Sequence, residues 1–468
     1  MSVGNKSDTL SHKLCSCNKT NTVNLNAPCT AAYKEDVMKT DVLIVGCGCS
    51  GLYAALNMPE NVKITIITKS DFESSDSFLA QGGICMLKND DDYKSYFEDT
   101  MKAGHYENDK KSVEIMIRSS QEVIRKLIRY GVEFKRDENG NLEFTREGAH
   151  SDKRILFHED ITGKEITSHL LEAVKKLNNV ELLEYTTLLD IVEEDGECKG
   201  AVIRKEDGAL EVINANCVFL ACGGIGGLYK HSTNFKHLTG DGVAIAIRHG
   251  IKLKDINYVQ IHPTTFYTAN DEDRSFLISE SVRGEGALLR DKNGNRFVNE
   301  LLPRDLLTQA IHAQMKKDHT EFVWEDLRTI PEDELKVHFP NIVAHCMEMG
   351  FDPTKECIPV VPAQHYFMGG IWVNHESHTS MKRLYAIGET ACNGVHGRNR
   401  LASNSLLESL VFAERAANDS MKYMDNTKEQ RLEVELNEYY DSSRLEDIYK
   451  NSVRKEIEKA DIAMTATA

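Results

Sequence analysis

One short segment constrains the fold of this chain more than any other. The residues Gly46-Cys47-Gly48-Cys49-Ser50-Gly51 fit the pattern G-x-G-x-x-G, between the continuously apolar run 42–45 and residues 52–56, which have helical character. Such an apolar run is typical of a strand buried on both faces of a parallel sheet. The three glycines then permit a tight turn, backbone approach to a pyrophosphate, and close helix–strand packing. The segment predicts a dinucleotide-binding site, although a glycine-rich turn without a ligand would satisfy the same pattern.

Strand-like and helical segments alternate through most of the remaining sequence. The β-branched run 63–68 completes one strand–helix–strand unit, and residues 111–130 carry apolar side chains at helical spacing. Further strands are expected near 180–205 and at 217–222, and a helix is expected near 300–320. Interleaved strands and helices predict an α/β fold.

Composition narrows the classes of function. The chain has 468 residues, enough for two to four domains, and a net charge of −17, which argues against nucleic-acid or acidic-membrane partners. No apolar run approaches the ~18 residues of a membrane-spanning helix, and the first thirty residues lack the apolar stretch of a secretory signal. The twelve cysteines fall far below the density of a disulfide scaffold, so we expect reduced thiols and a cytoplasmic protein.

The two ends of the chain differ from its middle. Residues 1–36 are rich in Asn, Ser, Thr and Lys without apolar periodicity, which predicts a flexible tail. Cys15, Cys17 and Cys29 lie in that tail, but their spacing matches no strong ligand template, so no metal site is expected. After about residue 414 the chain is acidic, helical in pattern and poor in Gly and Pro.

The residue after the second predicted strand bears on which dinucleotide binds. An acidic residue there would bind the ribose of NAD, but this chain has Lys69, which leaves FAD or a 2′-phosphate open. Other glycine-containing segments favour FAD, because they offer close backbone approach or a carboxylate for ribitol or ribose hydroxyls. These segments are 78–83, 218–224, 240–242 and 384–389. Each could be an ordinary sheet-edge turn, and their recurrence on one chain is what favours FAD.

Seven ordered motifs connect the chain to a known family. They are Ala80-Gln81-Gly82-Gly83, Thr145-Arg146-Glu147-Gly148-Ala149-His150-Ser151, Gln260-Ile261-His262-Pro263-Thr264, Arg283-Gly284-Glu285-Gly286-Ala287, Pro303-Arg304-Asp305, Pro362-Ala363-Gln364-His365-Tyr366 and Asn399-Arg400-Leu401-Ala402-Ser403-Asn404-Ser405-Leu406. Over about residues 40–415 the chain resembles the L-aspartate oxidases, within the succinate dehydrogenase and fumarate reductase flavoprotein superfamily.

The resemblance implies a particular α/β architecture. It consists of a Rossmann-like FAD-binding domain, an inserted α+β capping domain and a short C-terminal helical segment. After the tail at 1–36, the implied FAD-binding parts are 37–255 and 366–420, the capping domain is 256–365, and the C-terminal segment is 421–468. The active site is expected between the FAD-binding and capping domains.

The resemblance also implies FAD as cofactor. Besides the glycine-rich segment, the implied contacts are Lys69, Ser77, Phe78, Leu79, Ala80, Gln81, Gly82, Gly83, Thr187, Leu188, Gly223, Gly224, Asp241, Glu389, Ser405 and Leu406. Asp76 occupies the position where respiratory members of the superfamily attach flavin through histidine. Because a carboxylate cannot form that linkage, we expect noncovalent FAD, and Asp76 would repel the cofactor's phosphates unless it points away.

A dicarboxylate substrate requires cationic groups, and the planar fork of arginine binds a carboxylate bidentately. Arg400 by itself could be a surface residue, and a lone histidine is more often structural than functional. The resemblance implies that Arg400, His262 and His365 face the substrate carboxylates. It also places the hydroxyl of Ser279 where the family commonly has threonine.

Two further residues are expected to define the chemistry. Arg304 follows Pro303 at a predicted helix start, where a solvent-facing cation would oppose the helix dipole. This conflict favours a functional role, and the matching arginine of the superfamily transfers a proton and contacts substrate. Glu147 is assigned to the substrate ammonium group, which favours an amino acid over succinate because an unpaired buried charge is costly.

The implied reaction is the two-electron oxidation of L-aspartate to iminosuccinate, with electrons passed to O2 or fumarate. In the family the imine feeds quinolinate synthesis for NAD, which makes quinolinate synthase a candidate partner. A soluble fumarate reductase is the enzymatic alternative, and Glu147 argues against it. A flavin-binding protein without turnover is the other alternative, and the joint presence of His262, Arg304, His365 and Arg400 argues against it.

Overall fold

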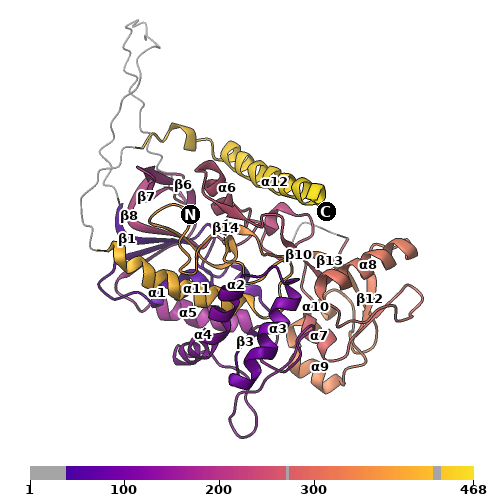
Figure 1. Ribbon diagram of the computed structural model, residues 1–468. Coiled ribbons are helices and arrows are strands. Elements are labelled where there is room, and N and C mark those ends of the chain that lie inside the picture. The colour runs from indigo at the N-terminus through magenta and orange to yellow at the C-terminus, as the bar shows by residue number, and fades with distance from the viewer. Residues whose placement is uncertain (1–37, 270–273, 425–433, 468) are drawn as a thin grey trace, which may run out of the picture. The chain divides into compact units, whose positions relative to one another are not determined.

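The computed structural model describes residues 38–269, 274–424 and 434–467 (Figure 1). The predicted N-terminal tail, with Cys15, Cys17 and Cys29, lies outside the described residues. Within the described ranges, helices and strands alternate along most of the chain, which confirms the predicted α/β class.

The largest sheet among the described residues has seven strands. Six of them follow the order β5-β2-β1-β8-β7-β6, and the seventh, β15, also pairs with β8. Strands β5, β2, β1, β8 and β15 run parallel, whereas β7 pairs antiparallel with β8 and β6. The strands are β1 (Met38–Val45), β2 (Ile64–Ile67), β5 (Val180–Leu183), β6 (Thr187–Glu194), β7 (Glu197–Arg204), β8 (Leu210–Leu220) and β15 (Leu384–Ala386).

The central strand β1 explains why its sequence is continuously apolar. Val42 and Ile44 belong to one core cluster, whereas Leu43 and Val45 belong to a second cluster. Side chains alternate between the two faces of a strand, so both faces of this sheet are covered. Every residue of the run is therefore buried, and none of them can be polar without cost.

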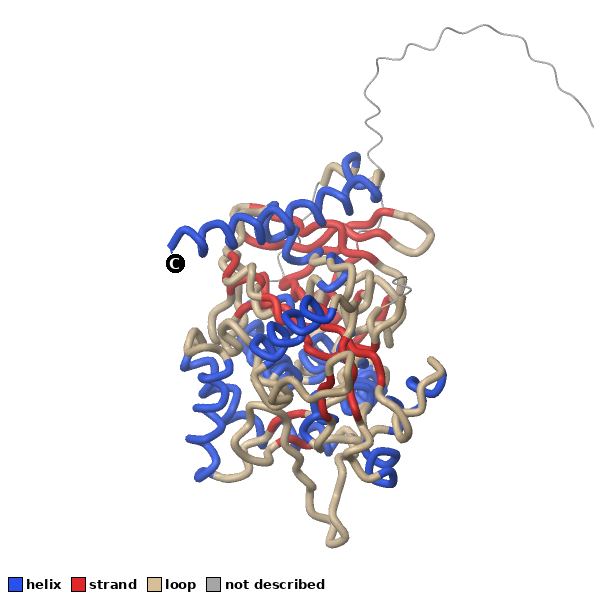
Figure 2. The backbone as a smooth tube through the Cα atoms, turned by 90° about the vertical axis from the view of Figure 1, so that its right-hand side faces the viewer, coloured by secondary structure: helices blue, strands red, loops and turns tan. Residues whose placement is uncertain are grey.

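Helices cover the two faces. On one face α1 (Cys49–Leu56) packs against α5 (Thr162–Val174) and α11 (Ser405–Ser420), and α11 packs against α4 (Lys110–Arg129). On the other, α12 (Ser442–Thr467) packs against α6 (Asp241–Arg248). The hydroxyl of Tyr449 on α12 donates to the Leu189 carbonyl oxygen of β6 at 2.7 Å, so α12 lies beside that part of the sheet (Figures 1 and 2).

A second, four-stranded sheet is wholly antiparallel, in the order β10-β13-β12-β11, and has its own apolar core. Its strands are β10 (Val259–Phe266), β11 (Leu288–Arg290), β12 (Val323–Asp326) and β13 (Ile358–Phe367). The helices of this region are α7 (Glu280–Gly284), α8 (Arg304–Asp318), α9 (Glu332–His338) and α10 (Pro340–Glu348). Helix α8 begins at Arg304, directly after Pro303, as the sequence predicts.

Smaller elements complete the described structure. They are α2 (Asp76–Leu79), α3 (Tyr93–Ala103), the pair β3 (Ile84–Cys85) and β4 (Ile155–Leu156), and the three-stranded sheet of β16 (Ala391–Cys392), β14 (Gly370–Trp372) and β9 (Leu253–Lys254). None of the helices in the described ranges is both long and apolar enough to pass through a bilayer.

Candidate active site

A cavity lies where the carboxyl ends of β1, β2 and β8 meet residues of the second sheet and its helices. The predicted residues that line it are Gly46, Cys47, Gly48, Cys49, Ser50, Lys69, Ser77, Leu79, Ala80, Gln81, Gly82, Gly83, Glu147, Thr187, Leu188, Gly223, Asp241, His262, Ser279, Arg304, His365, Glu389, Arg400, Ser405 and Leu406. Of the predicted residues, all of which are described, only Gly51, Phe78 and Gly224 are absent from its lining.

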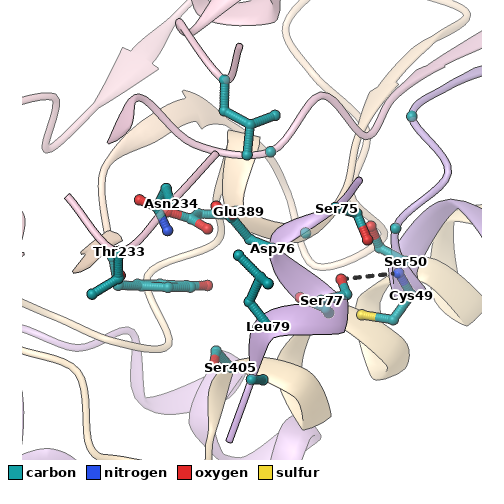
Figure 3. A pocket seen from close by; sticks show the side chains of 18 of the residues that line it. Cys49, Ser50, Ser75, Asp76, Ser77, Leu79, Thr233, Asn234, Glu389 and Ser405 are labelled. Carbon is teal, nitrogen blue, oxygen red and sulfur yellow. Dashed lines mark hydrogen bonds between the residues drawn. The ribbon is translucent and has the colours of Figure 1, made fainter. Parts of the chain in front are cut away.

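Two glycines make the turn between β1 and α1 possible. Gly46 has φ +121°, and a Cβ there would lie 2.1 Å from the Ala221 carbonyl oxygen. A Cβ at Gly51 would lie 2.1 Å from the Gly46 carbonyl oxygen, so Gly51 serves helix–strand packing. At the start of α1 the Cys49 N–H donates to Ser77 Oγ at 3.1 Å (Figure 3). The amino end of α1 thus meets the cavity, where its dipole favours a phosphate.

Several polar atoms of the cavity wall are buried without a hydrogen-bond partner among the described residues. They are Ser75 Oγ, Asp76 Oδ2, Gln81 Oε1 and Asn234 Oδ1. Buried polar groups are normally paired, so these atoms indicate a polar ligand. The pyrophosphate, ribityl hydroxyls and ring heteroatoms of FAD suit both these atoms and the end of α1, and the residues therefore fit this cofactor.

Lys69, which stands where an NAD-binding site would carry an acid, has its own carboxylate partner. Its Nζ donates to Asp241 Oδ2 at 3.0 Å and to the His237 carbonyl oxygen at 3.2 Å. Thr239 Oγ1 donates to the other Asp241 oxygen at 2.7 Å. Asp241, the first residue of α6, thus supplies the carboxylate that the sequence lacks after β2. Lys69 and Asp241 both line the cavity.

Arg304 and Arg400 share one acceptor at the other end of the cavity. Arg304 Nη1 donates to Gln260 Oε1 at 2.8 Å, and Arg400 Nε donates to the same oxygen at 3.3 Å. Arg400 also donates to Ser405 Oγ at 2.8 Å and lies 4.8 Å from the centroid of the Tyr366 ring. Burial, followed by the charge of Arg304, lowers the pKa of Arg400 to about 10. Two buried cations this close favour an anionic ligand.

Glu147 is buried beside the two arginines and accepts two hydrogen bonds. Ser281 Oγ donates to its Oε1 at 2.9 Å and Ser403 Oγ donates to its Oε2 at 2.6 Å. Burial, followed by the charge of Glu280, raises the pKa of Glu147. Glu280 itself accepts from Arg304 Nε at 2.6 Å, and although burial opposes the effect, Arg304 lowers its pKa. Glu280 therefore has a hydrogen-bonded cation, whereas the hydrogen bonds to Glu147 come from hydroxyl groups, with the charge of Arg304 acting on it from farther away.

His262 and His365 lie together, with ring centroids 5.0 Å apart and edge to face. Burial, followed by the charge of Arg304, lowers the pKa of both rings well below the usual range, so both are neutral near pH 7. His262 Nδ1 lies 2.9 Å from the Thr264 carbonyl oxygen and 3.1 Å from the Thr264 backbone nitrogen, and the Thr233 hydroxyl lies 2.7 Å from His365 Nδ1. His262 Nε2 is buried without a partner among the described residues.

Some residues that hold the site together had no role in the sequence prediction. Gln260 and Ser403 stood inside noted motifs, and Glu280 and Ser281 adjoin Ser279, which accepts from the Ser281 N–H at 3.3 Å and so caps α7. Gln260 contacts Arg400, 140 residues away, and Ser403 contacts Glu147, 256 residues away. The one signal in the sequence was that these polar side chains lie within or next to a motif. Their spacing in the sequence does not show which distant residues they contact.

Fold and cavity together define an FAD-binding flavoprotein, and comparison with known proteins agrees. Residues 41–406 match the protein family described as FAD binding domain, which confirms the predicted cofactor. The L-aspartate oxidase of Clostridium perfringens is 50% identical over 402 residues, which cover 85% of this chain and 91% of that protein. The L-aspartate oxidase of Bacillus subtilis is 38% identical over 417 residues, 87% of this chain and 77% of that protein. The chain belongs to the L-aspartate oxidase family.

Solved structures place the same fold in the wider superfamily. A quinol-fumarate reductase with menaquinol molecules has a TM-score of 0.80 and 29% identity, covering 91% of this chain and 76% of that one. The quinol fumarate reductase of E. coli has a TM-score of 0.79 and 30% identity, covering 89% and 74%. These similarities confirm the predicted superfamily.

Proposed function

We propose that this protein oxidises L-aspartate to iminosuccinate with FAD as the electron acceptor. The observation that carries the proposal is one cavity that brings the buried carboxylate of Glu147 together with the buried guanidinium groups of Arg304 and Arg400. L-Aspartate has one ammonium group and two carboxylates, so its charges complement these three side chains. The names of the curated relatives agree with this substrate.

Residues 46–50 of the glycine-rich segment, Lys69, Asp241 and Glu389 would hold FAD, together with Ser77 and residues 79–83. Bound noncovalently, this cofactor supplies a two-electron acceptor that takes a hydride from substrate C2. The cavity-lining end of α1 and the unpartnered polar atoms near Ser75 and Gln81 support this assignment.

The substrate carboxylates are assigned to Arg304, Arg400 and the two neutral histidines. Gln260 and the Tyr366 ring fix the direction of Arg400, so little side-chain freedom is lost when a carboxylate binds. His262 and His365 are assigned to the carboxylates as neutral hydrogen-bond donors, in the tautomer with the proton on Nε2, and the Ser279 hydroxyl completes the set. This arrangement orients the substrate and excludes water from it.

Arg304 is assigned to proton transfer at the substrate. It lies at the first turn of α8 and donates through Nε to Glu280 at 2.6 Å. The paired Glu280 holds the guanidinium in one direction, and such preorganisation is essential because arginine has a very high pKa. As C2 loses a hydride, the substrate ammonium group gives up a proton. Arg304, already a guanidinium, passes a proton of its own to Glu280 as it takes this one up, and the imine is left in its protonated form.

Glu147 is assigned to substrate selection. A diacid without an ammonium group would leave its charge buried and unpaired, which costs several kcal/mol, on the order of 3–5. This observation argues against the alternative, a soluble fumarate reductase, although solved fumarate reductases share the fold. It favours an amino acid substrate over succinate.

The physiological setting follows the sequence prediction. We assign O2 or fumarate as final electron acceptor, quinolinate synthesis for NAD as the fate of the imine, quinolinate synthase as a partner, and the cytoplasm as location.

We likewise propose the domain division expected from the sequence. It consists of FAD-binding parts at 37–255 and 366–420, a capping domain at 256–365 and a C-terminal segment at 421–468. The second sheet, which spans 259–367, supports the position of the capping domain.

An anaerobic titration tests the proposal. L-Aspartate is added to the purified holoprotein while flavin absorbance is followed, and fumarate is then added. We expect aspartate to bleach the flavin and fumarate to restore the absorbance. No bleaching by aspartate would contradict the proposal, and bleaching by succinate alone would favour the fumarate reductase alternative.

A further inference from the structure

Arg154 is a wholly buried cation that lies outside the cavity, directly before β4. Its Nη1 donates to Asp99 Oδ2 at 2.7 Å, and its Nη2 donates to Asp92 Oδ1 and to Ser95 Oγ, both at 3.0 Å. The guanidinium carbon also lies 5.1 Å from the centroid of the Tyr96 ring. Two carboxylates thus hold the guanidinium in one direction, because breaking either contact would leave a buried charge without its partner.

The same guanidinium contacts a histidine ring four residues earlier in the chain. Arg154 Nη1 lies 3.1 Å from His150 Nδ1, and His150 Nε2 lies 3.0 Å from the Ala402 carbonyl oxygen. A guanidinium only donates and a carbonyl oxygen only accepts, so His150 Nδ1 is the acceptor and Nε2 carries the proton. Burial, followed by the charge of Arg154, lowers the pKa of His150 to about 4, which agrees with a neutral ring. The Cys85 Sγ lies 3.7 Å from the same carbonyl oxygen, so the imidazole makes the shorter contact.

The Ala402 carbonyl belongs to a strained turn that carries two groups of the site. Ser403 has φ +61°, in the left-handed region that residues with a side chain rarely adopt. Its hydroxyl accepts from the Gly83 N–H at 3.2 Å and donates to Glu147 Oε2 at 2.6 Å. Arg400 stands two residues before Ala402. A strained conformation persists only where neighbouring contacts hold it, and the Ala402 carbonyl is one point at which this turn is held.

The histidine side of the contact is strained in the same way. Ala149, directly before His150, has φ +64°, and the His150 N–H donates to the Glu147 carbonyl oxygen at 3.4 Å. The hydrogen bond from His150 to Ala402 therefore joins two turns that are 252 residues apart in the sequence. One turn carries Glu147 and the other carries Arg400, which are the groups assigned above to the ammonium and to a carboxylate of the substrate.

We propose that His150, oriented by Arg154, is a positioning residue for the turn at 402–403. Through that turn it sets where Arg400 lies relative to Glu147. Neither His150 nor Arg154 lines the cavity, so neither contacts the substrate. A neutral imidazole suits this role because it accepts at one nitrogen and donates at the other, which an ammonium or a carboxylate cannot do. The effect on the substrate rests on the proposed function, whereas the placement of the turn does not.

Hydrogen exchange of the holoprotein, followed by mass spectrometry without L-aspartate, tests the placement of the turn. His150→Leu removes both hydrogen bonds of the ring, whereas His150→Gln keeps one acceptor and one N–H donor. We expect peptides covering 399–405 to exchange about tenfold faster in His150→Leu and within about threefold of the parental rate in His150→Gln. Peptides covering β1 should exchange at the parental rate in both variants, which distinguishes lost positioning from general unfolding. His150→Phe is a further variant without the hydrogen bonds, in case His150→Leu packs poorly.

Steady-state kinetics with L-aspartate tests the consequence for the substrate. KM should rise about tenfold in His150→Leu while kcat stays within about threefold, because Arg400 is assigned to a carboxylate that does not react. His150→Gln should return KM to within about threefold of the parental value. Lys153→Gln is the matched control, since it changes an exposed residue of the same segment and should leave both exchange and kinetics unaltered.

Several results would overturn the proposal. Parental exchange of 399–405 in both His150→Leu and His150→Phe is one, and faster exchange over the whole chain is another. Equal effects of His150→Leu and His150→Gln, on exchange or on KM, would also overturn it, as would a fall in kcat with KM unchanged. If the parent does not oxidise L-aspartate, the proposed function fails, and the exchange measurement still decides the role of His150.

Discussion

Replacing Glu147 with Gln keeps the shape of the side chain and removes the charge assigned to the substrate ammonium group. Glu147 is 4% exposed, so solvent cannot take over this role. Breaking a buried ion pair costs roughly 3–5 kcal/mol. The lower figure applies here, because the raised pKa of Glu147 indicates that its unpaired charge is itself unfavourable in the empty site. About 3 kcal/mol corresponds to a loss of about 150-fold in kcat/KM for L-aspartate.

The assay compares two substrates on the same variant. Anaerobic flavin reduction by L-aspartate should slow as stated, whereas reoxidation by fumarate, which has no ammonium group, should change less than about threefold. Glu143→Gln is the matched control, because it removes an exposed carboxylate from the same segment and should alter neither rate. Equal losses with both substrates, or a loss under about fivefold with aspartate, would refute the assigned role.

Three further predictions concern pH, substrate affinity and stability. Burial and the charge of Glu280 raise the pKa of Glu147, and only the ionised form of Glu147 pairs with an ammonium group. The value of kcat/KM for L-aspartate should therefore fall as the pH drops through that raised pKa. The pH–rate profile of Glu147→Gln should lack this fall at acidic pH. Arg400→Lys keeps the charge but loses the forked contact, so KM for L-aspartate should rise about 10–100-fold in steady-state assays. Gly46→Ala would place a Cβ 2.1 Å from a backbone oxygen at φ +121°, which should lower the free energy of unfolding by about 3 kcal/mol or more, measured by denaturant titration. Gly140→Ala, with nothing within 4 Å of the added Cβ, should cost only about 1 kcal/mol in the same titration.

The strand–turn–helix unit at residues 42–56 could be predicted because each of its determinants is local. A continuously apolar strand needs cover on both faces, and β1 has a core cluster on each. A glycine stands at each point of close backbone approach, and it can be recognised in the sequence without knowing which distant residue comes close. Helix α8 was predictable for the same reason, since Pro303 precedes its first residue, Arg304.

The contacts that give the cavity its chemistry could not be predicted in this way. The oxygen shared by the two arginines belongs to Gln260, and the carboxylate paired with Arg304 belongs to Glu280 on another helix. Asp76 looked like a residue that should point away from the cofactor, yet a backbone N–H from the 233–235 segment anchors it in the wall. Such partners depend on how distant loops meet, which no short pattern records.

Gln260 has a consequence for the length of the substrate. One carbonyl oxygen binds both guanidinium groups, at 2.8 and 3.3 Å, and therefore fixes the distance between them before any ligand arrives. Gln260 Nε2 is in turn held by Asn399 Oδ1 at 2.8 Å and by the Arg400 carbonyl oxygen at 2.9 Å, so the amide cannot turn to widen the gap. Gln260 thus holds the two guanidinium groups at one spacing, and a diacid one methylene longer than aspartate, such as glutamate, has to meet both of them at that same spacing.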